Sequence, residues 1–176
     1  MKFGIFYEHQ LPRPWNENSE HRLIKDSLDQ ISLADDLGYD YAWEVEHHFL
    51  EEYSHSSAPE VFLAAASQRT KNIRLGHGII QLTTNHPARV AEKVATLDLV
   101  SDGRVELGLG EGSSVTELHP FNLRFRDKRD VWEDGVKCVL PMFYNHAWEY
   151  SGEFFNFPLR AVVPKPLQKP HPPLWV

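Results

Sequence analysis

The chain has 176 residues, 41% of them hydrophobic, and a net charge of −7 at pH 7. This size and apolar content suit one ordinary domain, and the negative charge argues against nucleic acid or an anionic membrane as the main partner. Cys138 is the only cysteine, which excludes an internal disulfide and fits a reducing cytoplasm. The sequence has no apolar run long enough to span a bilayer or act as a signal peptide.

The first predicted elements are a strand and a helix. Residues 3–7 are short and apolar, as in a buried strand. After a polar loop, apolar residues recur at helical spacing at Leu23, Ile24, Leu28, Ile31 and Ala34. Ser19 is a candidate N-cap for this helix, and Gly38 is a candidate stop.

The next two units repeat this order. Residues 41–45 predict a strand, residues 46–57 a polar loop rich in histidine, and Pro59 the first turn of a helix. Residues 73–82 predict a third strand. Two glycines interrupt it, Gly76 and Gly78, which indicates a bulge or a close backbone approach.

The third unit continues with a helix that starts at Pro87 and has a regular apolar stripe. Residues 105–109 predict the fourth strand. A further helix is marked by Val131, Trp132, Val136, Val139 and Phe143, and Pro141 should kink or end it. Residues 148–157 predict a hairpin whose aromatic residues are expected to pack structurally.

The chain closes with a proline-rich loop, residues 164–173, and a fifth strand that starts at Leu174. Strands that alternate with helices predict a parallel sheet, either open and doubly wound or closed as a barrel. No glycine fingerprint follows the first strand, where a dinucleotide fold would have it. Eight units would need about 250 residues, so these 176 supply about half of a barrel.

Catalytic groups of a parallel barrel gather at the carboxyl ends of its strands. The polar residues that follow the first four predicted strands are Glu8, His9, Glu46, His47, His48, Thr83, Thr84, Asn85, His86, Glu111, Ser113 and Ser114. Because four histidines occur at these positions, we interpret the cluster as functional.

His47 is the candidate for acid–base chemistry, since imidazole titrates near neutrality. Metal binding is the weaker alternative, because no tight ligand spacing occurs. His48 and Glu46 are expected to hold loop hydrogen bonds. The run from Gly108 to Ser114 can present backbone N–H groups to an anionic or planar ligand, although a plain glycine turn explains it equally well.

Several motifs occur together in one order. They are Met1-Lys2-Phe3-Gly4, Glu46-His47-His48-Phe49, Asn85-His86-Pro87, Asp102-Gly103-Arg104, Gly108-Leu109-Gly110 and the run Pro164–Pro173. Over its whole length the chain resembles the bacterial-luciferase-like, flavin-dependent monooxygenases.

This resemblance implies a (β/α)8 TIM-barrel fold, with residues 1–176 as the N-terminal part of a single barrel domain. It implies reduced FMN and O2 as reactants, a small aldehyde-like substrate, a separate flavin reductase, and a dimer. His47 would transfer protons. A non-proline cis peptide at Gly78–Ile79 would support the flavin ring, and the flavin would also contact Gly110, Glu111, Ser113 and Ser114.

The chain departs from the family pattern in one charge. Glu111 stands where luciferase has an arginine for the flavin phosphate, so that role does not carry over. Glu111 is expected to face another group or to mark a branch with different flavin chemistry. The main phosphate contacts of the family follow the fifth strand, where this sequence ends.

Three alternatives to the oxygenase stay open. One is hydride transfer with the deazaflavin F420, which uses the same fold. Another is a flavin-binding protein without catalysis. The third is a metal-dependent hydrolase barrel.

Overall fold

The computed structural model describes all 176 residues. Its main sheet has five parallel strands in chain order: β1 (Gly4–Tyr7), β2 (Tyr41–Glu44), β3 (Arg74–Gln81), β4 (Val105–Gly110) and β7 (Leu174–Trp175). A doubly wound sheet reverses its strand order at a switch point, whereas a barrel keeps sequential order. The structure therefore confirms the barrel-type fold, with five of the eight strands of a closed barrel.

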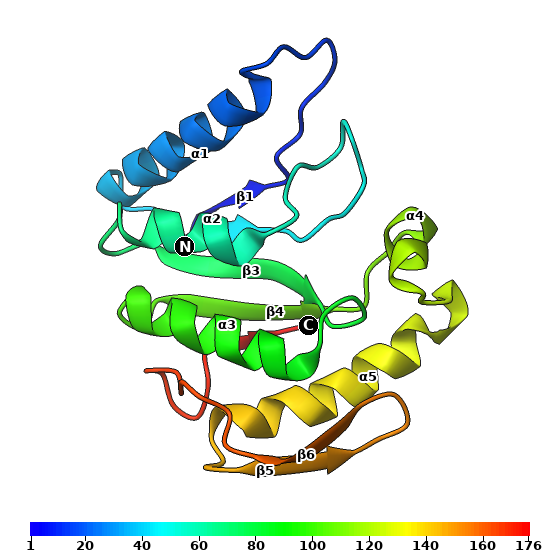
Figure 1. Cartoon of the computed structure of the whole chain (residues 1–176). Coiled ribbons are helices and arrows are strands. Elements are labelled where there is room, and N and C mark those ends of the chain that lie inside the picture. Colours follow the sequence, from blue (N-terminus) through cyan, green and yellow to red (C-terminus); the bar gives the residue numbers. More distant parts are fainter.

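Four helices cover one face of this sheet (Figure 1). They are α1 (Ser19–Asp36), α2 (Pro59–Ser67), α3 (Pro87–Val100) and α5 (Lys128–Val139). The connection from β4 to α5 holds a short helix and two 3-10 turns, α4 (Val115–Leu118), η1 (His119–Phe121) and η2 (Phe125–Asp127). Beyond α5 come η3 (Leu140–Phe143) and the predicted hairpin, formed by β5 (Trp148–Ser151) and β6 (Asn156–Arg160).

Helix ends follow the sequence signals closely. The N-cap of α1 is Asn18, one residue before the expected Ser19, whose hydroxyl instead accepts from the Asn16 N–H at 2.9 Å. Gly38 lies just beyond the end of α1 with φ of +81°, a conformation that suits glycine. Pro141 lies in η3, where α-helical geometry ends, as expected.

The core lies between the sheet and the helices. Leu63 from α2, Leu75 from β3 and Leu107 from β4 are fully buried there. On the other face of the sheet, the Trp43 ring occupies the space beside Gly76, where a Cβ would approach it to 2.1 Å. Gly76 therefore makes room for the Trp43 ring. The irregularity in β3 is a register shift further along the strand, between His77 and Ile80.

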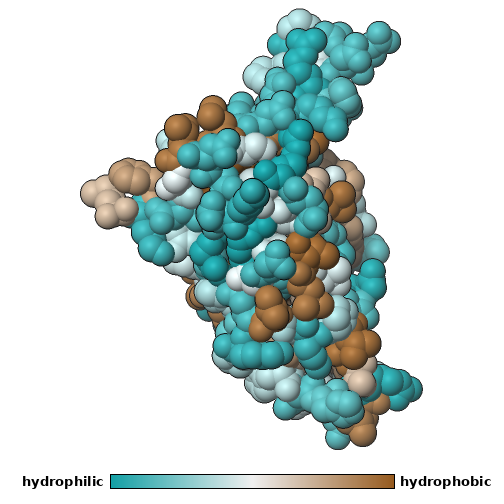
Figure 2. Space-filling model, turned by 90° about the vertical axis from the view of Figure 1, so that its left-hand side faces the viewer, coloured by the Kyte–Doolittle hydropathy of each residue, from teal (hydrophilic) through white to brown (hydrophobic).

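The proline-rich loop is fixed at the amino ends of the strands. The backbone N–H of Gln168 donates to Asp98 at 2.9 Å, and its side-chain amide donates to Asp98 at 2.7 Å. Figure 2 views this end of the molecule and shows a mainly hydrophilic surface with several separate apolar patches. None of the helices has the length and apolar character of a membrane span.

His77 is a buried polar group inside the apolar layer. Its side chain on β3 is fully buried, and neither ring nitrogen has a hydrogen-bond partner. Burial lowers the pKa of His77 from 6.5 to about 4; the fields of Glu60 and Glu46 oppose this shift, and that of Lys93 adds to it. The folded chain therefore holds His77 neutral.

We predict that His77 makes the fold acid-sensitive. Its pKa is lower in the folded than in the unfolded chain, so stability from this residue is present above pH 6.5 and is lost as pH falls toward 4. Replacement His77→Leu should remove about 2–3 kcal/mol of the pH dependence of unfolding free energy across this window. Urea unfolding near pH 6.5 and near pH 4 measures this change in the unfolding free energy.

The matched control is His21→Leu, at an exposed position on α1. This control should unfold with the pH dependence of the parent chain. Equal pH dependence in the His77 variant and the control would contradict the assignment.

Candidate functional site

The carboxyl ends of β1 to β4 meet at one edge of the sheet (Figure 1). Strand register aligns Tyr7 with Glu44, Glu44 with His77, and Gln81 with Gly110. The polar residues expected at strand ends are thereby brought to one side of the molecule. This edge also carries α4, which the sequence did not predict.

His47 lies between two carboxylates at this edge. Its Nδ1 is 2.8 Å from Glu117 Oε1, and its Nε2 is 3.5 Å from Glu8 Oε2. Its backbone N–H donates to the Ser56 carbonyl at 2.8 Å, and its ring meets Tyr53 edge to face. Since only 16% of the side chain is exposed, the ring is held in one position yet remains reachable.

Glu117 is the functional candidate that sequence reasoning missed. It lies on α4, and its carboxylate is fully buried. Oε1 accepts the backbone N–H of His48 at 3.1 Å and the side-chain amide of Gln81 at 3.0 Å, while Oε2 has no partner. The sequence carried one signal, because Ser114 and Glu117 have the Ser-x-x-Glu spacing of a helix start.

Glu46 organises the neighbouring loops. Its Oε1 faces His48 Nε2 at 3.0 Å and accepts from Asn85 Nδ2 at 2.7 Å, and its Oε2 accepts the Gln81 N–H at 2.9 Å. His48 therefore holds the loop hydrogen bond expected of it. This network ties the ends of β2 and β3 together directly beneath His47.

A groove of about 430 Å³ borders the loop that carries His47. Phe49 contributes an exposed ring there, with a positive φ of 63°. Its ring centroid lies 5.8 Å from that of Phe121, from the turn that follows α4. Apolar surface is thus available beside the imidazole.

Gly78, Ile79 and Gly110 lie together on adjacent strands. The space beside Gly78 is bounded by the Phe6 ring, and that beside Gly110 by the Ile79 side chain. The register between β3 and β4 shifts here, with one extra residue on β3 between His77 and Ile80. The interruption of this strand is therefore a bulge.

The expected cis peptide at Gly78–Ile79 is wrong. All cis bonds of the chain precede proline, at Arg13–Pro14, Val163–Pro164 and Lys169–Pro170. The bulge accommodates the extra residue with trans peptide bonds, which cost less than a non-proline cis bond.

The loop after β4 has its own charge balance. Glu111 Oε1 lies 2.9 Å from Lys128 Nζ, and this ammonium also donates to the Gly112 carbonyl at 2.9 Å. Glu111 thus faces a cation, as expected of a residue without the phosphate role. Ser113 is exposed, whereas the Ser114 hydroxyl accepts from the Thr116 N–H and caps α4.

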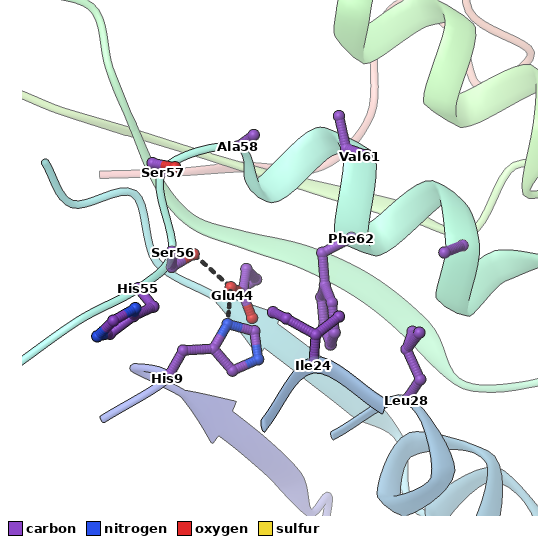
Figure 3. A pocket seen from close by; sticks show the side chains of 11 residues that line it. His9, Ile24, Leu28, Glu44, His55, Ser56, Ser57, Ala58, Val61 and Phe62 are labelled. Carbon is purple, nitrogen blue, oxygen red and sulfur yellow. Dashed lines mark hydrogen bonds and ion pairs between the residues drawn. The ribbon is translucent and has the colours of Figure 1, made fainter. Parts of the chain in front are cut away.

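A second cavity, of about 230 Å³, lies behind the His47 loop (Figure 3). Ile24, Leu28 and Phe62 form its apolar wall, and at its base Glu44 contacts Ser56 and lies 2.8 Å from His9 Nδ1. Burial raises the pKa of Glu44, and contacts with His9 and Ser56 offset part of the shift.

This buried cluster supports the loop rather than a ligand. The unpartnered Nε2 of His9 and Oε2 of Glu44 have almost no accessible surface, so neither atom can contact a molecule in the cavity. Ser56, in contrast, accepts the His47 N–H through its carbonyl group. The cluster therefore fixes the loop from behind. No group of three or more His, Cys, Asp or Glu residues is arranged to hold a metal ion.

Known proteins that are similar to this chain in sequence include monooxygenases. Residues 1–176 match the sequence profile of the luciferase-like monooxygenases. The chain is 30% identical to the oxygenase component of a flavin-dependent trigonelline monooxygenase from Acinetobacter baylyi and 29% identical to the alkanal monooxygenase alpha chain of Photorhabdus luminescens. Each alignment covers 100% of this chain and 48% of the relative, so the chain spans about half the length of these relatives.

Solved structures agree on the fold. The monooxygenase RslO1 from Streptomyces bottropensis superposes with a TM-score of 0.91 at 32% identity, over 99% of this chain and 52% of that one. Two others share the fold at lower identity. An FMN complex of the oxygenating constituent of 3,6-diketocamphane monooxygenase from Pseudomonas putida has a TM-score of 0.81 at 20% identity, over 89% and 43% of the two chains. An F420-dependent secondary alcohol dehydrogenase superposes with a TM-score of 0.79 at 22% identity, over 98% of this chain and 51% of that one.

We predict that Glu46 is a main stabilising contact of this edge. Replacement Glu46→Ala leaves the buried Gln81 N–H without its acceptor and the Asn85 amide and His48 ring with one partner fewer, and should lower the unfolding free energy by about 2–4 kcal/mol. Denaturant unfolding followed by circular dichroism measures this change.

The control is Glu92→Ala, which removes an exposed ion pair with Arg89 on α3. Its effect should stay below about 1 kcal/mol. A Glu46 variant as stable as this control would show that the network contributes little.

Proposed function

The chain belongs to the luciferase-like monooxygenase family, and from this we propose that it forms part of an oxygenase that uses reduced FMN and O2 to oxidise a small aldehyde-like substrate. The observation that carries the proposal is His47, held between Glu117 and Glu8 at the carboxyl edge of a barrel-type sheet. The identity with an alkanal monooxygenase supports the substrate class. Within this proposal, residues 1–176 are the N-terminal part of one barrel domain.

His47 is the catalytic residue of this proposal. Its Nδ1 is engaged by a buried carboxylate, so Nε2 is the ring atom available for proton transfer. The Glu8 carboxylate lies 3.5 Å from this nitrogen and so borders the position at which a proton would be exchanged. The adjoining groove and the exposed Phe49 ring supply apolar surface for an organic substrate.

The residues at the strand ends fit a flavin. Gly78 and Gly110 lie on adjacent strands beside the Ile79 side chain and the largely exposed Phe6 ring, and a planar flavin ring would pack against this part of the strand ends. Ser113 adds an exposed hydroxyl group at the end of β4. Glu111 and Lys128 form a neutral pair, so this loop does not repel a phosphate as an isolated Glu111 would. The residues that we assign to the cofactor site are Gly78, Ile79, Gly110, Glu111, Ser113 and Ser114.

When bound, reduced FMN supplies the two electrons for oxygen activation. The overall reaction of an aldehyde is balanced: aldehyde, reduced FMN and O2 give carboxylic acid, oxidised FMN and water. A separate flavin reductase must then regenerate the cofactor, and the name of the trigonelline relative as an oxygenase component supports such a partner. The proposal includes a dimeric enzyme in the cytoplasm.

We predict that His47→Ala lowers kcat by about 10²–10⁴-fold, because it removes the proton-transfer group. Flavin affinity should change far less, since the surface beside Gly78 and Gly110 stays intact. Stopped-flow turnover and an FMN fluorescence titration separate the two effects. His146→Ala, at an exposed position before the hairpin, is the control and should behave as the parent chain. Full activity of the His47 variant would rule out the catalytic role.

The F420-dependent enzyme is the second candidate, because a hydride-transfer enzyme shares this fold. We predict that titration with both cofactors gives tighter binding of FMN than of F420. Tighter binding of F420, with reduction of the substrate and no O2 consumption, would favour the deazaflavin enzyme. Retained FMN without O2 consumption would instead indicate a flavin-binding protein without catalysis.

A further inference from the structure

One carboxylate oxygen, Glu117 Oε1, is the meeting point of three nitrogen atoms. The backbone nitrogen of His48 lies at 3.1 Å, Gln81 Nε2 at 3.0 Å and His47 Nδ1 at 2.8 Å. The carboxylate is fully buried, so water does not compete for this oxygen. Its hydrogen-bonding role therefore depends on these three neighbours.

Two of the three neighbours can only donate. A backbone nitrogen carries a hydrogen and has no acceptor capacity. The orientation of the Gln81 amide is fixed as well, because the same Nε2 lies 2.9 Å from the Glu46 carbonyl oxygen, which can only accept. Glu117 Oε1 therefore accepts hydrogen bonds from both the His48 backbone N–H and the Gln81 side-chain amide.

The O–H oxygen of a carboxyl group is a much weaker acceptor than a carboxylate or carbonyl oxygen, so the two N–H groups directed at Oε1 disfavour a proton on it. Consequently Nδ1 of His47 must provide the hydrogen for the third and shortest contact. We infer that Glu117 is a positioning residue that fixes His47 as the Nδ1–H tautomer and leaves the lone pair of Nε2 for proton exchange. The catalytic meaning of this inference rests on the proposed function, whereas the tautomer itself does not.

The other neighbours of His47 do not fix the tautomer. Glu8 Oε2 is 3.5 Å from Nε2, beyond ordinary hydrogen-bond length. The Ser56 carbonyl binds the backbone N–H, and Tyr53 packs against the ring edge to face. These contacts hold the position of the imidazole but do not choose which nitrogen carries the hydrogen. Glu117 alone makes that choice.

Nitrogen-15 NMR of histidine-labelled chain tests the inference without flavin, O2 or substrate. At alkaline pH, where the ring is neutral, long-range proton–nitrogen correlations show which ring nitrogen is protonated, and His47→Asn identifies the signals. We expect the Nδ1–H form in the parent chain. A His47 ring with its hydrogen on Nε2 would overturn the inference directly, with no need for a Glu117 variant.

Two Glu117 variants and one control extend the test. Glu117→Gln keeps an oxygen acceptor and should keep the Nδ1–H form, whereas Glu117→Met has similar size without an acceptor and should lose the preference. Glu8→Gln changes the carboxylate at the other ring nitrogen and should leave the tautomer unchanged. Retention of Nδ1–H in the Met variant would overturn the role of Glu117. If the Met variant does not fold, the parent and Gln spectra decide.

Turnover gives the second readout. The Met variant should lose on the order of 10²-fold in kcat with little change in KM, and the Gln variant should recover part of that loss. A parent chain with the Nδ1–H tautomer but no oxygenase activity would reject the proposed function and leave the tautomer assignment standing. An active parent chain with the Nε2–H tautomer would reject the tautomer assignment and leave the proposed function standing.

Discussion

The buried carboxylate of Glu117 connects three strand ends that are far apart in the sequence. It accepts from His48 in the loop after β2 and from Gln81 at the end of β3, while its own helix, α4, follows β4. Buried polar groups are stabilised by hydrogen bonds, and all those of the Glu117 carboxyl group are made by Oε1. The loop conformations at this edge therefore depend on one another through a single oxygen atom, and the position of His47 depends on all of them.

The parallel sheet makes this arrangement available. Because β1 to β4 lie side by side in chain order, every loop that follows a strand starts at the same edge. Glu46 then joins the ends of β2 and β3, and the cluster of His9, Glu44 and Ser56 supports the His47 loop from the side of the helices. The imidazole is fixed by polar contacts, while the exposed Phe49 ring adds apolar surface to the mixed lining of the adjoining groove. Such a combination suits proton transfer next to an organic molecule.

Much of the architecture follows from local patterns in the sequence. The alternation of short apolar runs with helical stripes predicted every strand of the main sheet to within about two residues, the usual accuracy of such boundaries. Gly38 and Pro141 marked helix ends because each restricts the backbone locally. The position of His47 just after a strand was predicted in the same way, and its catalytic role stays a prediction. The hairpin and the irregular proline-rich loop were also predicted correctly.

Long-range contacts explain what the sequence did not reveal. Glu117 is 70 residues from His47, and only the folded chain brings the two together. The space at Gly76 is filled by Trp43 from the neighbouring strand, and Glu111 meets Lys128 from α5, neither of which a local pattern encodes. The bond expected to be cis at Gly78–Ile79 is trans, and β3 has a bulge against β4 at this point.

The most direct test of the central claim is oxygen labelling. The complete oxygenase, with FMN, a flavin reductase and a straight-chain aldehyde, would be supplied with ¹⁸O2 in unlabelled water, and the acid product analysed by mass spectrometry. We predict that the acid carries a single ¹⁸O atom and that a His47 variant forms little of it. Product without label, or substrate turnover without O2 consumption, would contradict a flavin-dependent oxygenase and point to hydride transfer on the same fold.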